Sequence, residues 1–427
     1  MNYRVSHPSK KLIGSIELTA SKSESNRALI IQALCSEKFE IKNLAAAEDT
    51  TTLQHIILSS KLKSPTSKVD AQPSATTYDV GAAGTTMRFL TAYFSITPGT
   101  HILTGSERMK NRPIGILVSA LRELGADIEY MEKEGFPPLK IKGREPEGSF
   151  VEIDGSVSSQ YVSALLLIAP QLKNGLQLKF KGEVTSRPYI NMTLKMMEEF
   201  GVNAQWQGDT ITVSKQSYNK KSKDYVYEVE GDWSSASYWY AIATLSTEVE
   251  FTVKGLNHPA KSLQGDAVVA DIFSNLGIRT EYVNGAVRLT KFGKIASSFE
   301  FDFSNCPDLA QTIATVVSAL KTPSVFKGLH TLRIKETDRT AALKNELAKL
   351  GTEVTIVSNE EIKIKSGSII KNPAPIATYE DHRMAMAFAV FALTCNFITI
   401  QHPEVVKKSY PDFWRDLKKT GFVIDEV

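Results

Sequence analysis

Apolar residues gather in runs that recur at long and nearly constant intervals along the chain. Each run begins with small or polar residues and continues as an almost wholly apolar stretch, which is typical of a buried helix with a capped N-terminus. The six starts are Ser23, Gly84, Ser158, Ser234, Asp308 and His382. The first interval is 61 residues, and the next four are 74 to 76 residues. A period of this length indicates a duplicated supersecondary unit rather than a solenoid repeat.

A second series of apolar positions follows the same period and lies on one face of a predicted helix. These stripes end at glycines, namely Gly125, Gly201, Gly277, Gly351 and Gly421. Short alternating segments, such as 3–18 and 101–104, predict strands between the helices. Residues 59–77, rich in Ser, Lys, Thr and Pro, predict an exposed loop. Six units, each with one buried helix, one amphipathic helix and several strands, predict an α+β protein.

The chain has 427 residues, a length typical of two or three domains. The polar, basic segment 214–224 precedes a short strand, and we place one domain crossing there, near Glu230, and another near Thr19. The predicted domains are therefore 20–230, and 1–19 together with 231–427. Each is expected to contain three of the six units.

Charge and cysteine usage narrow the function classes. The net charge of +3 is too weak to indicate nucleic acid, and the basic residues are dispersed rather than gathered in stripes. Cys35, Cys306 and Cys395 lie far apart without metal-ligand spacing, so we expect free thiols, a cytoplasmic location and no metal site. The longest apolar run, 384–395, is too short to span a bilayer, so no membrane role is expected.

Cations stand at the predicted loops and helix starts. A helix N-terminus is positive and disfavours Lys and Arg, unless an anion also binds there. Serines and a glutamine at similar positions can donate hydrogen bonds to the same anion, and the carboxylates among them are Asp308, Glu336 and Asp338. Many cations, few carboxylates and no metal ligands suit two small polyanions that react with each other. The cations are Lys22, Arg27, Arg88, Arg112, Lys335, Arg339, Arg383 and Lys408.

Nine motifs between Ser21 and Phe413, in order, resemble the EPSP synthase family, the 3-phosphoshikimate 1-carboxyvinyltransferases. They are SKSESNR, AGTTMR, MKNRPIG, DGSVSSQ, SRPYI, EGDWSSAS, RIKETDR, DHRMAM and KKSYPDF. The resemblance implies two similar domains, each of three βαβαββ units, with buried helices whose N-termini face the substrates. It also implies transfer of the enolpyruvyl group of phosphoenolpyruvate to the 5-hydroxyl of shikimate 3-phosphate, without a cofactor, and inhibition by glyphosate.

The resemblance assigns roles to residues of this chain. Asp308 is the expected proton acceptor, and Glu336, assisted by Lys22, is expected to deliver a proton to the methylene carbon. The residues expected to bind shikimate 3-phosphate are Lys22, Ser23, Arg27, Ser158, Ser159, Gln160, Ser186, Tyr189, Asp308, Thr331 and Lys335. Those expected to bind phosphoenolpyruvate are Lys22, Gly84, Arg112, Gln160, Arg339, Arg383 and Lys408.

Three residues depart from the family pattern, and two other functions compete with the main hypothesis. Ala82 stands where the family usually has Asn, Phe89 where it often has Pro, and Thr331 where many members have Asn. A UDP-N-acetylglucosamine enolpyruvyl transferase would have Asn in place of Ser23 and usually a loop cysteine, which is missing between Cys35 and Cys306. A catalytically silent phosphosugar-binding homologue would lack Asp308 or Glu336. We expect a monomer that binds the two substrates.

Overall fold

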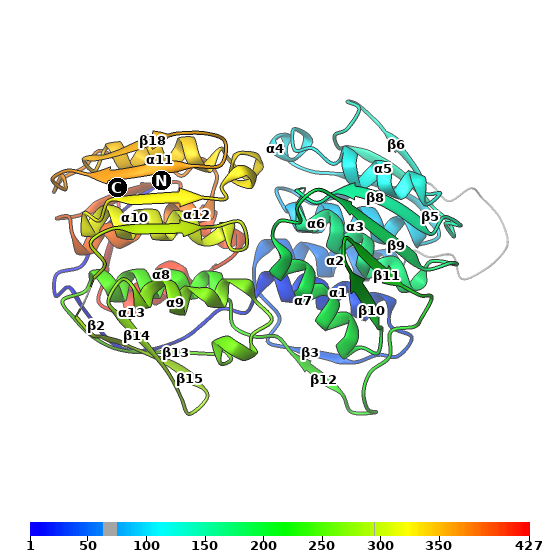
Figure 1. Ribbon diagram of the computed structural model, residues 1–427, viewed down its shortest axis with the longest axis horizontal. Helices are drawn as coiled ribbons and strands as arrows, with labels where there is room; N and C mark the ends of the chain where they lie inside the picture. The colour runs from blue at the N-terminus through cyan, green and yellow to red at the C-terminus, as the bar shows by residue number, and fades with distance from the viewer. Residues whose placement is uncertain (63–74, 157, 294) are drawn as a thin grey trace. The chain divides into compact units, whose positions relative to one another are not determined.

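The computed structural model describes residues 1–62, 75–156, 158–293 and 295–427. The chain forms two compact units, of which the first comprises Lys22–Val229 and the second comprises Met1–Ser21 with Glu230–Val427. Figure 1 shows helices and sheets alternating as layers in each unit. The loop predicted for 59–77 falls largely outside the described residues. Both of its ends are wrong, because the helix α2 (Glu48–Leu62) continues through residues 59–62 and a strand, β4 (Thr76–Asp79), begins at Thr76.

The described part of the first unit contains two four-stranded sheets of one design. In each sheet two parallel strands are joined by a buried helix, as parallel pairing requires, and an antiparallel hairpin completes the sheet. A third sheet pairs β3 (Glu40–Lys42) with β12 (Val226–Glu228) in parallel. The four-stranded sheets have the orders β4-β5-β7-β6 and β8-β9-β11-β10. Their strands are β4 (Thr76–Asp79), β5 (Gly99–Thr104), β6 (Asp127–Tyr130), β7 (Leu139–Gly143), β8 (Phe150–Asp154), β9 (Leu176–Lys181), β10 (Ala204–Gln207) and β11 (Thr210–Val213).

The described part of the second unit repeats this design. Its four-stranded sheets have the orders β2-β13-β15-β14 and β16-β17-β19-β18, again with one parallel pair and one hairpin. The strands are β2 (Lys11–Glu17), β13 (Glu248–Lys254), β14 (Ile278–Val283), β15 (Ala286–Lys291), β16 (Phe299–Asp302), β17 (Ser324–Lys327), β18 (Thr352–Ile356) and β19 (Ile362–Ser366).

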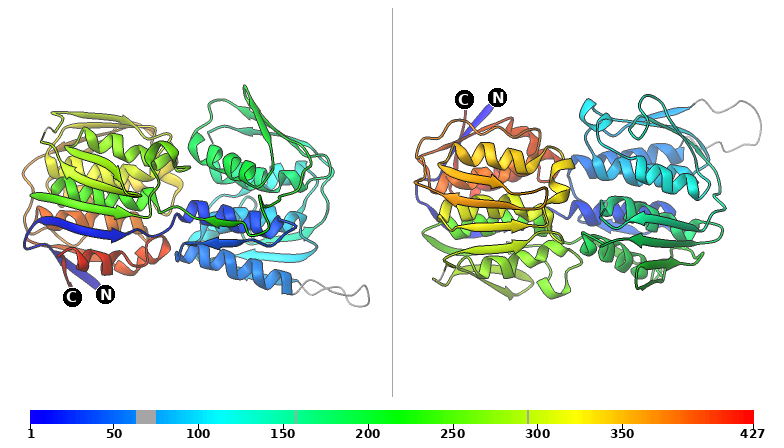
Figure 2. Two further views of the ribbon diagram at one scale, coloured as in Figure 1. Left: turned by 90° about the horizontal axis from the view of Figure 1, so that it is seen from below. Right: turned by 45° about the horizontal axis from the view of Figure 1, so that its top comes forward.

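The beginning of the chain completes the last repeat of the second unit. Strand β1 (Asn2–Ser6) lies between β20 (Ile398–Gln401) and β21 (Val423–Glu426) and is antiparallel to both. Ile376 forms a parallel bridge with Ile400 and so takes the place that the first strand has in the four-stranded sheets. The chain ends therefore lie side by side, as Figure 2 shows, with Asn2 donating to the carbonyl of Val427 at 3.2 Å.

Three central helices in each unit are buried on nearly all sides, as their all-round apolar sequences predict. In α3, residues 84–95 are all buried, and in α8 residues 233–244 are all buried. The predicted α+β class with buried helices is confirmed. The central helices are α1 (Lys22–Leu34), α3 (Gly84–Ile96), α6 (Ser159–Ile168), α8 (Trp233–Leu245), α10 (Ala310–Leu320) and α12 (His382–Ala389).

Amphipathic helices cover the sheets at the predicted stripes. They are α5 (Gly115–Glu123), α7 (Arg187–Glu199), α9 (Val269–Ser274), α11 (Arg339–Ala348) and α13 (Phe413–Lys419), with the short α4 (Glu107–Lys110) before α5. Short 3₁₀ turns complete the chain at η1 (Ala169–Gln171), η2 (Pro259–Lys261), η3 (Gly265–Val268), η4 (Pro307–Leu309), η5 (His330–Ile334), η6 (Val390–Leu393) and η7 (Pro403–Lys408).

Candidate functional site

A buried guanidinium organises the polar residues of the second unit. Arg339 opens α11 and is 1% exposed. It donates from Nε to Asp381 at 2.8 Å, from Nη1 to Asp308 at 2.9 Å and from Nη2 to Glu336 at 2.9 Å. Burial works to lower the pKa of Arg339, but the three carboxylates outweigh it and raise the pKa above its ordinary value. Arg339 is therefore a fixed positive charge that holds three loops together.

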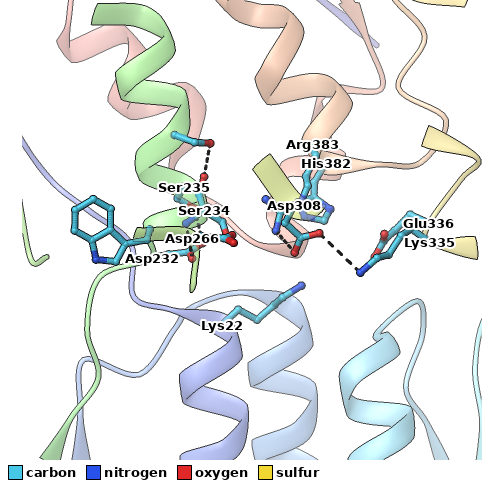
Figure 3. A network of polar contacts seen from close by, with 12 residues as sticks. Lys22, Asp232, Ser234, Ser235, Asp266, Asp308, Lys335, Glu336, His382 and Arg383 are labelled. Carbon is cyan, nitrogen blue, oxygen red and sulfur yellow. Dashed lines mark hydrogen bonds and ion pairs between the residues drawn. The ribbon is translucent and has the colours of Figure 1, made fainter. Parts of the chain in front are cut away.

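Asp308 is the most heavily paired carboxylate of this cluster, and Figure 3 shows it between Arg383 and Lys335. Arg383 donates to its Oδ2 at 2.8 Å, and the Nζ of Lys335 lies 3.9 Å from its Oδ1. Burial works to raise the pKa of Asp308, but Arg383, Lys335 and Arg339 together hold the pKa well below its usual range. Asp308 is therefore ionised at neutral pH.

The ion pairs of the cluster contain more cations than carboxylates. Lys408 lies 3.3 Å from Glu336, and Arg383 also reaches the hydroxyl of Tyr238 at 3.4 Å. Four cations, Lys335, Arg339, Arg383 and Lys408, thus share the three carboxylates Asp308, Glu336 and Asp381. The side chains of Asp308, Lys335 and Glu336 keep 12–24% of their surface exposed, so small solutes can reach the cluster.

Hydrogen bonds join the N-terminal halves of the three central helices of the second unit. Ser237 of α8 bonds to Thr312 of α10 at 3.1 Å, and Arg383 of α12 contacts Tyr238 of α8. Helix N-termini carry a partial positive charge and unpaired N–H groups. Their joint placement adds to the positive potential that the four cations create, and this favours an anionic ligand.

In the first unit, Lys22 and Arg27 lie on the first turns of α1 but have different surroundings. The Nζ of Lys22 is 3.2 Å from Asp49, and its side chain is 16% exposed. Arg27 is buried and donates to Thr193 at 2.7 Å, to Ser163 at 2.9 Å and to two backbone carbonyls. Burial lowers the pKa of Arg27 to about 10. These contacts join α1 to α6 and α7, so Arg27 supports the site from inside the unit.

The start of α3 lies directly against Arg112. A Cβ placed on Gly84 would be 2.7 Å from Nη1 of Arg112, which is closer than real side chains approach. Arg112 is 7% exposed, and its Nε has no hydrogen-bond partner among the described residues. A buried donor of this kind is unfavourable unless a ligand pairs with it. The Gly84–Arg112 contact therefore suits an anion that binds at the first turn of α3.

The remaining predicted residues of the first unit frame α6 and α7. Ser158 caps α6 by accepting from the N–H of Gln160 at 3.3 Å, and Gln160 donates to Thr85 of α3 at 3.2 Å. Ser186 precedes α7 in the left-handed region with φ of 54°, which orients its side chain away from a normal cap. Ser23 and Ser159 lie in the first turns of α1 and α6, and Tyr189 in the first turn of α7, which Arg27 contacts.

The prediction that Asp308, Glu336 and Asp338 are the only carboxylates among the cations is incomplete. Asp338 caps α11, because its Oδ1 accepts from the N–H groups of Thr340 and Ala341. Asp381 and Asp49 were missed, although they pair with Arg339 and Lys22. Asp381 had a readable signal, since it stands one residue before the apolar helix α12 and caps it. Thr331 is buried, and its hydroxyl has no hydrogen-bond partner among the described residues.

The described residues lack a metal cluster and a membrane-spanning helix. In 1–62, 75–156, 158–293 and 295–427, three or more His, Cys, Asp or Glu side chains nowhere gather in a way that could hold a metal ion. Across these same ranges, every helix is too short or too polar to cross a membrane.

Comparisons with known proteins find similarity along nearly the whole chain. A sequence model of the family described as EPSP synthase (3-phosphoshikimate 1-carboxyvinyltransferase) matches residues 6–417. A 3-phosphoshikimate 1-carboxyvinyltransferase of Bacteroides fragilis (strain YCH46) is 48% identical over 99% of both chains. The protein of the same name from Colwellia psychrerythraea is 38% identical over 97% of this chain and 98% of that one.

Solved structures support the fold. The EPSP synthase of Acinetobacter baumannii aligns over 100% of both chains with a TM-score of 0.75 at 19% identity. The enolpyruvyl transferase NikO of Streptomyces tendae aligns over 100% of this chain and 99% of that one, with a TM-score of 0.73 at 15% identity.

Proposed function

The chain belongs to the EPSP synthase family, the 3-phosphoshikimate 1-carboxyvinyltransferases, and on that premise we propose how its residues carry out the reaction. The enzyme transfers the enolpyruvyl group of phosphoenolpyruvate to the 5-hydroxyl of shikimate 3-phosphate and releases phosphate, a step of the shikimate pathway. The observation that best supports the residue assignment is the Arg339 cluster, in which four cations share three carboxylates.

Phosphoenolpyruvate carries a phosphate and a carboxylate, so its binding site needs several cations. In the second unit, Arg339, Arg383 and Lys408 supply them, and in the first unit Lys22 and Arg112 do so. Gly84 leaves room beside Arg112, whose Nε lacks a partner among the residues described, and Gln160 adds a neutral donor. Planar guanidinium groups match both anionic groups of this substrate.

Shikimate 3-phosphate is bound through its phosphate and hydroxyl groups. Its phosphate takes the first turns of α1, α6 and α7, where hydroxyl donors and backbone N–H groups surround a cation. Tyr189 packs against the ring. The residues proposed to bind it are Lys22, Ser23, Arg27, Ser158, Ser159, Gln160, Ser186 and Tyr189 in the first unit, and Asp308, Thr331 and Lys335 in the second.

Asp308 accepts the proton of the attacking 5-hydroxyl, and Glu336 in its protonated form, assisted by Lys22, delivers a proton to the methylene carbon. Loss of phosphate and return of a proton from the resulting methyl group to Glu336 then restore the enolpyruvyl double bond. Without substrate, Asp308 is a weak base because Arg383, Lys335 and Arg339 lower its pKa. Phosphoenolpyruvate brings negative charge to Arg339 and Arg383 and so offsets their effect on Asp308. The bound substrate thereby raises the pKa of Asp308 and makes it a stronger base when the hydroxyl is in place.

A phosphate-release assay tests the function directly. Phosphate should appear when both substrates are present and stay at background with either substrate alone. Release with UDP-N-acetylglucosamine in place of shikimate 3-phosphate would favour the sister transferase. Binding of both substrates without phosphate release would favour the silent phosphosugar-binding homologue.

We further propose that the two compact units are the two domains of the fold, with three repeats each, and that the enzyme is a cytoplasmic monomer. Cys35, Cys306 and Cys395 are free thiols, which fits a reducing compartment. Size-exclusion chromatography with light scattering measures the mass in solution. A mass of about 47 kDa is expected from the chain of 47.1 kDa, and twice that mass would contradict the monomer.

A further inference from the structure

A buried carboxyl group outside the proposed substrate contacts interacts electrostatically with the Asp308–Arg383 pair. Asp266 belongs to η3, is 2% exposed, and accepts a hydrogen bond from the hydroxyl of Ser234. Ser234 lies in the first turn of α8, and its N–H donates to the helix cap Asp232 at 3.2 Å. Figure 3 shows Ser234, Asp232 and Asp266 close together at the start of α8. Asp266 therefore holds the first turn of α8 through Ser234.

Arg383 is the cation that these carboxylates share. Its guanidinium is 2.8 Å from Asp308 and interacts electrostatically with Asp266 and Asp232 as well. The titratable groups around Asp266 come from three directions: Asp232 at the start of α8, Asp308 with the neighbouring thiol of Cys306, and Arg383 of α12. Burial raises the pKa of Cys306, so this thiol stays neutral. The local charge is therefore set by the three carboxyl groups and Arg383.

We propose that Asp266 is a positioning residue whose ionisation controls how firmly Arg383 is held by protein carboxylates, and hence how tightly the site binds an anionic substrate. An ionised Asp266 attracts Arg383 towards the protein and repels the incoming anion. A protonated Asp266 keeps its hydrogen bond with Ser234 but adds no charge. Asp266 is not among the residues proposed to bind substrate and acts through Arg383 and Asp308. The inference rests on the proposed binding of phosphoenolpyruvate by Arg383.

The change of charge falls in an accessible pH range. Burial, with the charge of Asp308 in support, raises the pKa of Asp266 to about 7, whereas the pKa of Asp308 is held low. Asp266 and Asp308, although they belong to one network, thus titrate at very different pH. A bound anion should raise the pKa of Asp266 further, because the two negative charges repel, so substrate binding and protonation of Asp266 favour each other.

The test compares the pH dependence of substrate binding in the native enzyme and in Asp266→Asn. KM for phosphoenolpyruvate and kcat are measured from pH 6 to 9 at saturating shikimate 3-phosphate. Asparagine keeps an acceptor for Ser234 and carries no charge, so native KM should rise on the order of tenfold relative to the variant at alkaline pH. Because both enzymes bind the same substrate, the ratio of their KM values cancels the effect of the substrate's own titration. Asp271→Asn, an exposed carboxylate on the adjacent α9, is the matched control and should give a flat ratio.

A ratio of native to Asp266→Asn KM that stays within twofold across this range would overturn the proposal. If Asp266→Asn does not fold, Ser234→Ala provides the second measurement. The Ser234 hydrogen bond lowers the pKa of Asp266, so its loss should move the rise in KM to higher pH, and an unmoved profile would equally overturn it. Failure of the proposed function is distinguishable, because the native enzyme would then release no phosphate at any pH.

Discussion

The contacts of Arg27 and Arg339 differ in kind, although both residues are buried arginines at a helix start. Arg27 donates to hydroxyl and carbonyl groups, and burial lowers its pKa to about 10. Arg339 contacts three carboxylates, which raise its pKa. Carboxylates of the protein compensate the charge of Arg339, so a substrate anion can replace one of them as its partner. The contacts of Arg27 chiefly hold three helices in register.

Replacing Asp308 by Asn should separate catalysis from folding. The amide keeps the shape of the side chain but cannot accept the proton of the hydroxyl, so kcat should fall by about a hundred- to ten-thousand-fold. Binding of shikimate 3-phosphate, followed by calorimetry, should persist. Asp425→Asn, on the exposed edge of β21, is the control and should keep normal kcat. Near-normal kcat in a folded Asp308→Asn enzyme would assign the base to another group.

Asp266 should also influence stability in a pH-dependent manner. Its pKa of about 7 exceeds the ordinary carboxyl value, so between roughly pH 4 and 7 the folded state binds a proton that the unfolded state releases. Stability from this group is therefore fully present below the unfolded pKa and declines as pH rises towards 7. The urea midpoint of the native protein should fall more between pH 5 and 8 than that of Asp266→Asn. Parallel pH profiles for the two proteins would contradict this.

The sequence predicted the cations of the site better than their partners. Lys and Arg at helix starts are visible locally because they oppose the helix dipole. Their carboxylates are distant in sequence: Asp381 is 42 residues from Arg339, and Asp308 is 75 residues from Arg383. A local pattern carries no information about such pairs. Asp266 was hidden for the same reason, since Ser234 lies 32 residues away in the same repeat and Asp308 belongs to the next one.

At the scale of helices, Asp381 has two separable functions. It caps α12 through the N–H of Arg383 at 2.9 Å and pairs with Arg339 at 2.8 Å. Asp381→Asn retains the cap and loses the ion pair, which should reduce stability by about 3–5 kcal/mol. Asp381→Ala loses both and should cost about 1 kcal/mol more. Chemical unfolding measures the two values, and equal stability of the variants would show that the cap contributes nothing.

The first turn of α3 determines the room beside Arg112. Gly84→Ala would place a methyl group 2.7 Å from Nη1, so the guanidinium must move. Because Arg112 and Gly84 are proposed to bind phosphoenolpyruvate, its KM should rise on the order of tenfold, and glyphosate should inhibit still less. Ala82→Gly, an exposed change of one methyl group two residues earlier, is the control. If Gly84→Ala retains native KM and inhibition, Gly84 does not line the substrate site.

Helices were predictable because their signal lies in the local sequence pattern. The six buried helices follow from all-round apolar runs, and the amphipathic helices from stripes that end in glycine. Strand pairing between distant segments was not readable: β2 pairs with β13, more than 230 residues later, and β1 lies between β20 and β21. Each of these pairings uses an ordinary alternating strand whose partner the local sequence does not specify.

At the scale of the whole molecule, the chain leaves one unit and returns to it. Residues before and after the first unit are joined, because Ser21 donates to the carbonyl of Glu230 at 2.8 Å and Ala20 bridges to Gly231. The carboxylate of Glu230 accepts from Trp233, Ser262 and Gln264 and so anchors this crossing in the second unit. Hydrogen bonds of the second unit therefore hold the residues on both sides of this crossing.

Hydrogen exchange should show which elements of each unit bind the substrates. If residues of both units bind the substrates, adding shikimate 3-phosphate with glyphosate should slow exchange in the first turns of α1 and α6 in one unit and of α10 and α12 in the other. Ligand binding stabilises only the regions whose opening releases the ligand, so protection should be stronger there than in the outer sheets. Arg383→Gln should lose protection of α12 and retain part of that at α1, where shikimate 3-phosphate binds. Protection confined to one unit in the native enzyme would mean that the other contributes no substrate contact, and the assignment of its cations would fail.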